Sequence, residues 1–122
     1  MKESEIIYLA CPYTHCDPSV RQQRAEQVTR LAARLIAEGA IVYSPVSHSH
    51  AITVVGRLPV DWDFWARQSL AMLAVCDRVL VYCLEGFERS VGVQAEIEAA
   101  RAAGKPVKYL YPELNETPRK HE

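Results

Sequence analysis

The sequence predicts an α/β protein, a flavodoxin-like three-layer sandwich with a central parallel sheet of four to five strands. Three observations support this prediction. Short apolar runs alternate along the chain with longer segments that have helical spacing, turn residues separate the two kinds of segment, and the apolar runs are continuous. Continuous apolar strands are typical of a parallel sheet covered on both faces, with right-handed crossovers between its strands.

Four strands are expected from the apolar runs at 6–10, 40–43, 78–84 and 107–110. The first run, Ile6-Ile7-Tyr8-Leu9-Ala10, has no polar residue that would mark a solvent face.

Three helices are expected between these strands. The pair Asp17-Pro18 is a helix-start signal, and apolar residues then keep helical spacing as far as Gly39, a suitable C-terminal residue. A second helix opens at Asp61, and a third runs from Ser90 to Gly104. The stretch 46–59 shows the least regular spacing of the chain, and we expect it to be irregular.

Composition indicates one globular domain. The chain has 122 residues, 49% of them apolar and 24% charged. We expect a single domain over residues 1–112 and a charged C-terminal tail over 113–122. The net charge of −1 gives no electrostatic reason to expect nucleic-acid or membrane binding. The polar, acidic N-terminus differs from a signal peptide, so a cytoplasmic location is expected.

The four cysteines contain no Cys-x-x-Cys pair. In a reducing compartment they are most simply free thiols, and Cys76 and Cys83 lie in apolar surroundings typical of a core. A zinc site is conceivable, but the spacing of its candidate ligands fits no familiar pattern (Cys11, His15, Cys16, His48 and His50). Neither a metal nor a cofactor is therefore expected.

Three loops should meet at the carboxyl edge of the sheet, where open parallel sheets bind ligands. They are 11–16, 44–63 and 86–92, and they concentrate Tyr, Ser, Thr, His and Asp. In the third loop, Ser90-x-Gly92 before a helix offers a hydroxyl and backbone N–H groups that suit a phosphate. The alternative is that Ser90 is a plain helix cap. Neither a Walker loop nor a dinucleotide fingerprint occurs.

Glu96 is a candidate catalytic residue. In the helix that begins near Ser90, Val93, Ile97 and Ala100 form an apolar stripe, and Glu96 borders it. No basic residue follows three or four positions later to pair with it. The alternative is an ordinary solvated glutamate.

Two further groups have more than one interpretation. His48 and His50 would point the same way in an extended segment, where they could contact a ligand, share a metal or decorate a surface loop. Trp62 and Trp65 could stack on a nucleobase, or they could anchor a helix to the core or to a partner subunit.

Several motifs together resemble the nucleoside 2-deoxyribosyltransferase-like superfamily, and within it a branch of short bacterial and phage proteins. The motifs lie within residues 6–111. They are Leu9-Ala10-x-Pro12-Tyr13, Ser44-Pro45-x-x-His48-Ser49-His50, Asp61-Trp62-x-Phe64-Trp65 and Ser90-x-Gly92-Val93-x-x-Glu96.

The resemblance implies roles for individual residues. Glu96 aligns with the family nucleophile, Ser90 with the serine that holds a 5′-phosphate, and Tyr8 with a tyrosine near the sugar. Ser69 stands where relatives carry an aspartate that contacts the sugar or protonates the base. The resemblance and the loop positions together give these candidate substrate-binding residues: Ser90, Gly92, Pro12, Tyr13, Thr14, His48, His50, Asp61, Asp63 and Ser69.

We therefore expect an enzyme that cleaves the N-glycosidic bond of a nucleoside or nucleoside 5′-monophosphate, with Glu96 and Tyr8 as catalytic residues. It would pass the sugar to water or to another base. The alternative is a nucleotide-binding or sensing module with little turnover, which Ser69 favours. The expected partner is the small-molecule nucleoside or nucleotide. A homodimer or higher homo-oligomer is also expected, because relatives complete their pockets with neighbouring subunits and three large aromatic residues crowd one helix start.

Overall fold

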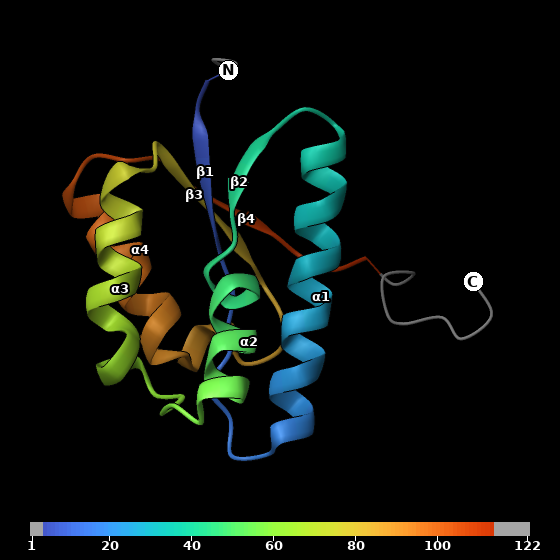
Figure 1. Ribbon diagram of the computed structural model, residues 1–122. Coiled ribbons are helices and arrows are strands. Elements are labelled where there is room, and N and C mark those ends of the chain that lie inside the picture. The colour runs from blue at the N-terminus through green and yellow to red at the C-terminus, as the bar shows by residue number, and fades with distance from the viewer. Residues whose placement is uncertain (1–3, 114–122) are drawn as a thin grey trace.

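The computed structural model describes residues 4–113, and Figure 1 shows their arrangement. Along the chain, the strands are β1 (Ile6–Ala10), β2 (Ile41–Tyr43), β3 (Arg78–Tyr82) and β4 (Val107–Leu110). The helices are α1 (Pro18–Ala37), α2 (Pro45–Gly56), α3 (Trp62–Val75) and α4 (Val91–Ala102). One turn of 3-10 helix, η1 (Phe87–Arg89), precedes α4. The expected charged tail lies outside the described residues from position 114 onward.

Within residues 4–113, the four strands form one sheet in the order β2-β1-β3-β4, and every pair is parallel. The strand β1 is central, pairing Tyr8 with Tyr43 of β2 and with Val79 of β3. The sequence-based expectation of an α/β fold with a flavodoxin-like parallel sheet is confirmed.

Two apolar cores lie on the two faces of the sheet (Figure 1). On one face, α1 and α2 cover a cluster that includes Leu9 and Val28. On the other, α3 and α4 cover a cluster that includes Val79, Val93 and Ile97. Alternate residues of β1 point to opposite faces, so Tyr8 belongs to the α3/α4 side and Leu9 to the α1/α2 side.

Helix caps explain where three of the helices begin. Asp17 accepts a hydrogen bond from the Ser19 amide at the start of α1, Asp61 accepts one from Phe64 in α3, and Ser90 accepts one from Val93 in α4. These side chains satisfy amides that have no partner within the helix. The helix starts expected at Asp17, Asp61 and Ser90 are confirmed.

One expectation about secondary structure is wrong. The stretch 46–59 is largely helical, because α2 runs from Pro45 to Gly56. Successive residues of a helix are about 100° apart, so His48 and His50 are about 200° apart and point in different directions. Proline at the first helical position was the available signal, but the apolar residues of this helix do not gather on one face, so periodicity did not reveal it.

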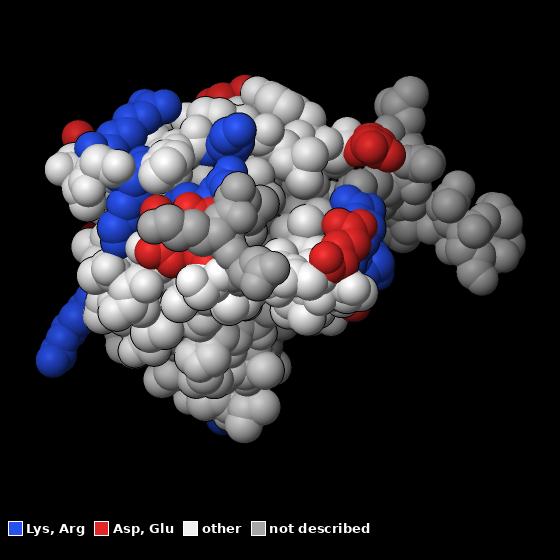
Figure 2. Space-filling model, turned by 90° about the horizontal axis from the view of Figure 1, so that it is seen from above, with Lys and Arg blue, Asp and Glu red and all other residues white. Residues whose placement is uncertain are grey.

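Figure 2 views the molecule from the end at which β1 begins, opposite the carboxyl ends of the strands. Lys and Arg side chains there are interspersed with Asp and Glu side chains. Among the described residues, no helix is long and apolar enough to cross a membrane.

Candidate functional site

A cavity of about 400 Å³ lies at the carboxyl end of the sheet. Four segments line it: the loop after β1, the first half of α2, the segment from Val60 into α3, and the turn that leads into α4. Its position agrees with the general rule for open parallel sheets. Polar side chains therefore meet here from parts of the chain that are far apart in sequence.

The carboxylate of Glu96 forms the buried end of this cavity. Glu96 is only 5% exposed and accepts a hydrogen bond of 2.5 Å from the Tyr8 hydroxyl through Oε2. Burial raises the pKa of Glu96 to about 7 from its ordinary value of 4.5, while the bond from Tyr8 lowers it. The alternative of an ordinary solvated glutamate is therefore wrong. This carboxyl group titrates close to neutral pH.

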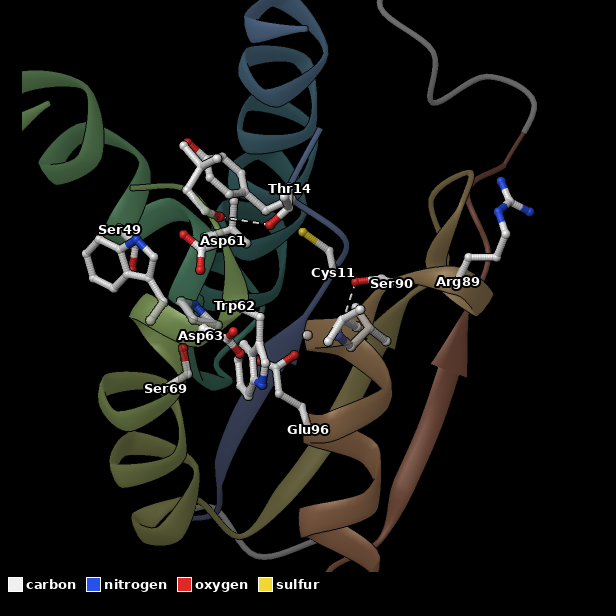
Figure 3. A pocket seen from close by; sticks show the side chains of 18 residues that line it. Cys11, Thr14, Ser49, Asp61, Trp62, Asp63, Ser69, Arg89, Ser90 and Glu96 are labelled. Carbon is white, nitrogen blue, oxygen red and sulfur yellow. Dashed lines mark hydrogen bonds between the residues drawn. The ribbon is translucent and has the colours of Figure 1, made fainter. Parts of the chain in front are cut away.

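Tyr8 lies behind the cavity and is linked to its wall through Glu96 and Ser69. Its side chain is fully buried, and burial together with the charge of Glu96 raises the pKa of its phenol. Ser69 of α3 also hydrogen-bonds to Tyr8 and lines the cavity. In Figure 3, Ser69 and Glu96 enter the cavity from α3 and α4. The three polar groups form one connected cluster.

The first turn of α4 forms a second part of the wall. Ser90 Oγ accepts a hydrogen bond of 3.2 Å from the Val93 amide, so Ser90 caps α4. This role still leaves the amides of Val91 and Gly92 at the helix start without an acceptor inside the helix. Figure 3 shows the guanidinium of Arg89 pointing away from the cavity. Binding of an anion at this wall would thus depend on the backbone amides of the helix start and on the Ser90 hydroxyl.

Trp62 packs directly on this helix start. A Cβ added at Gly92 would stand 3.1 Å from Cε3 of the Trp62 indole, closer than an ordinary contact. A larger residue at position 92 would need the indole to shift by a few tenths of an ångström. Trp65 also lines the cavity, and its ring nitrogen donates to the Pro59 carbonyl at 2.9 Å. Both tryptophans are half-buried walls of the cavity.

The loop after β1 contributes Tyr13 and Thr14 to the wall. The Thr14 hydroxyl donates to the Val60 carbonyl at 2.8 Å, which ties this loop to the segment before α3. Tyr13 bonds to Nδ1 of His50 at 2.7 Å. His50 thus lies behind Tyr13, and His48 is turned elsewhere, with its ring 5.9 Å from that of Tyr43.

The structure brings together most of the residues that the sequence singled out. Eight of them line the cavity: Tyr13, Thr14, Asp61, Asp63, Ser69, Ser90, Gly92 and Glu96. Two more act from behind it, namely Tyr8 through Glu96 and His50 through Tyr13. Pro12 is buried beside the cavity without lining it, and His48 lies outside. The expectation that His48 and His50 share one direction is wrong because α2 is helical.

Sequence reasoning missed Arg24 of α1. Its guanidinium donates to the Thr14 carbonyl and to the Glu85 carbonyl, each at 3.1 Å. It therefore joins the loop after β1 to the loop after β3, both of which border the cavity. No sequence signal marked it, since an arginine within a helix is ordinary. Cys11 was likewise missed as a lining residue.

The chemistry available here is that of a buried carboxyl group facing aromatic and hydroxyl side chains. A carboxylate in such a place can attack an electrophilic carbon or move a proton. Among residues 4–113, no three His, Cys, Asp or Glu side chains come together as metal ligands would.

No curated protein matches the chain. Residues 5–112 match a family described as Domain of unknown function (DUF1937). The match covers both the sheet and all the segments that line the cavity, so the chain belongs to this family.

Proposed function

We propose that this protein is an N-glycosidase or deoxyribosyltransferase acting on a nucleoside or nucleoside 5′-monophosphate, with Glu96 as the nucleophile. The single observation that carries the proposal is the buried Glu96 carboxylate, held by the Tyr8 hydroxyl at the end of a cavity of about 400 Å³. The resemblance of the sequence motifs to nucleoside 2-deoxyribosyltransferase-like proteins supports it.

The mechanism has two steps. In the first, an oxygen of Glu96 bonds to the anomeric carbon while the bond from that carbon to the base nitrogen breaks, and the base leaves with the electron pair. In the second, water or another base attacks the same carbon, and the glycosyl–Glu96 ester bond breaks. A carboxylate suits this chemistry because the transition state has oxocarbenium character.

Tyr8 and Ser69 prepare the nucleophile. The Tyr8 hydroxyl holds one carboxylate oxygen, which fixes its orientation and stabilises the ionised form. Ser69 bonds to Tyr8 in turn. The aromatic walls formed by Trp62 and Trp65 suit a planar base, and the start of α4 suits a phosphate.

The test is a chromatographic screen of nucleosides and their 5′-monophosphates for released base. We expect release by the wild-type protein and none by Glu96→Ala. Glu98→Ala is the matched control, because Glu98 is an exposed glutamate on the same helix. Equal rates in the wild type and Glu96→Ala would remove Glu96 from the mechanism.

One observation favours a second candidate, a nucleotide-binding or sensing module. Ser69 stands on α3 at the position where the resemblance implies a carboxylate, and the carboxylates that line the cavity near it are those of Asp61 and Asp63. Isothermal titration separates the two candidates. Nucleotide binding without base release from any substrate would favour the module.

The assembly proposed with this function is a homodimer or higher homo-oligomer. The tryptophans line the cavity, so they give less support to an oligomer than the sequence indicated. The stronger support is the exposed apolar surface of α2. There Val54 is 60% exposed and Val55 is 84% exposed. Phe64, at the start of α3, is 47% exposed. Light scattering after size exclusion checks the assembly, and a monomer mass at micromolar concentration would contradict it.

A further inference from the structure

The charged side chains that enter the cavity are all acidic. Among residues 4–113, the charged residues that line it are Asp61, Asp63, Arg89 and Glu96. Arg89 points away from the cavity, which leaves three carboxylates (Figure 3). Asp61 and Asp63 approach from the start of α3, and Glu96 approaches from α4. The α3 side of the cavity therefore has a negative charge that no lining cation faces.

Both aspartates have oxygens that are free to accept hydrogen bonds. Within residues 4–113, no hydrogen bond or ion pair engages the Asp63 side chain. Asp61 uses Oδ2 to accept from the Phe64 amide at 3.3 Å, and its Oδ1 has no such partner in the same residues. An ionised carboxylate accepts hydrogen bonds and donates none. A ligand that covered these oxygens without donating to them would leave buried charges unpaired, which is costly.

Two donors on the same side of the cavity are already used within the protein. The Thr14 hydroxyl donates to the Val60 carbonyl at 2.8 Å. The ring nitrogen of Trp65 donates to the Pro59 carbonyl at 2.9 Å. These bonds leave fewer donors for a ligand to meet there, so acceptor oxygens are prominent among the free polar groups.

The proposed reaction determines which part of the substrate meets this wall. The nucleophile and the leaving base lie on opposite faces of the sugar, so a sugar held at Glu96 directs its base away from α4 and toward α3. A phosphate group would be repelled by the aspartates and is better placed at the start of α4. The indoles of Trp62 and Trp65 offer faces on which a flat ring can stack, with its polar edge toward the neighbouring carboxylates.

We propose that the cavity selects a nucleobase with an exocyclic amino group, and that Asp63 is the residue that selects it. This inference rests on the proposed function, which places the sugar at Glu96. An amino group can donate to a carboxylate oxygen, whereas a carbonyl oxygen at the same place can only accept and would be repelled. Cytosine, adenine and guanine carry such an amino group, and uracil, thymine and hypoxanthine do not.

The experiment compares two pairs of nucleotides by isothermal titration. In each pair an amino group is replaced by a carbonyl oxygen: cytidine against uridine 5′-monophosphate, and adenosine against inosine 5′-monophosphate, as ribonucleotides and as deoxyribonucleotides. The titrated protein is Glu96→Gln, which should bind without releasing the base. We expect the amino-bearing member of each pair to bind at least about tenfold more tightly, as a hydrogen bond to a charged group would give.

Three variants in the same background complete the design. Asp63→Asn keeps the size of the side chain but adds an NH₂ group that can donate to a carbonyl oxygen, so the preference should be lost or reversed. Asp63→Ala should lose the preference without reversing it, and it stands in if Asp63→Asn fails to fold by circular dichroism. Asp17→Asn is the matched control, because Asp17 caps α1 outside the cavity and asparagine caps equally well.

Equal affinities within both pairs, or tighter binding of the carbonyl-bearing members, would overturn the inference and leave the proposed function standing. A preference that persists in both Asp63→Asn and Asp63→Ala would remove Asp63 from base selection. If the amino-bearing nucleotides bind more tightly but the wild type releases no base, the base selection holds and the glycosidase proposal fails. If neither Glu96→Gln nor the wild type binds any of these nucleotides, both proposals are refuted.

Discussion

The Tyr8 hydroxyl donates a hydrogen bond of 2.5 Å to Oε2 of Glu96, which joins the central strand β1 to α4. Both side chains are buried, so the bond is shielded from water. Burial raises the pKa of Glu96. Among the described residues 4–113, the hydrogen bond from Tyr8 is the only interaction that lowers it. The ionisation of Glu96 therefore depends on Tyr8.

Replacing Tyr8 by phenylalanine should raise the pKa of Glu96 further. Hydrogen bonds to charged groups contribute about 1.5–3 kcal/mol, which corresponds to about one to two pH units. We expect the acidic limb of the pH–rate profile for base release to move to higher pH by this amount. Tyr43→Phe is the control, since the Tyr43 ring lies 5.9 Å from that of Tyr8. An unmoved limb in Tyr8→Phe would contradict the prediction.

The same burial makes stability depend on pH. Because the pKa of Glu96 rises from 4.5 to about 7 on folding, its contribution to stability is fully present below pH 4.5 and is lost as pH rises through 7. The loss amounts to about 3 kcal/mol in the free energy of unfolding. Denaturant titrations at pH 4.5 and pH 8 should show this loss of unfolding free energy in the wild type and not in Glu96→Gln. Parallel behaviour of the two proteins would disprove it.

Gly92→Ala should impair binding more than stability. The new Cβ would stand 3.1 Å from the Trp62 indole and force it to move. Alanine gains about 1 kcal/mol of helix propensity, which offsets part of the cost. We expect a change in tryptophan fluorescence and weaker nucleotide binding, with little change in unfolding free energy. Adding Trp62→Phe should relieve the crowding, and an unchanged Trp62 signal in Gly92→Ala would argue against it.

Ser90→Ala should weaken binding of a nucleoside 5′-monophosphate more than binding of the nucleoside. The Ser90 hydroxyl and the amides that begin α4 form the anion-favouring wall. The lost cap also costs about 1 kcal/mol of stability. Asp17→Ala, which removes the cap of α1, controls for that cost. Titration calorimetry measures both ligands, and equal wild-type affinities for them would contradict a phosphate preference.

Much of the fold followed from local signals. Continuous apolar runs located every strand of the described chain, and Asp17, Asp61 and Ser90 located three helix starts. Such signals depend on residues that are close together in the sequence, so they can be recognised in a single sequence. The helix α2 escaped because its apolar residues are not confined to one face.

The site was predictable only in part for a related reason. Resemblance to known motifs implied that Glu96 and Tyr8 lie at one site, and a hydrogen bond joins them there. The contact between Tyr13 and His50 depends on α2 being a helix and on its rotation against α1. Packing between helices sets that rotation, and no spacing in the sequence records it.

The pairing of β1 with β3 has a consequence for how the protein is made. Their partners Ile7 and Arg78 are 71 residues apart in the chain. During synthesis, β1 can pair with β2 alone until the ribosome has released β3, so the nascent chain must keep one side of its first strand uncovered. Glu96, in α4, is synthesised after β3. A ribosome that stalls before β3 therefore leaves a chain with an open strand edge, one that chaperones would bind.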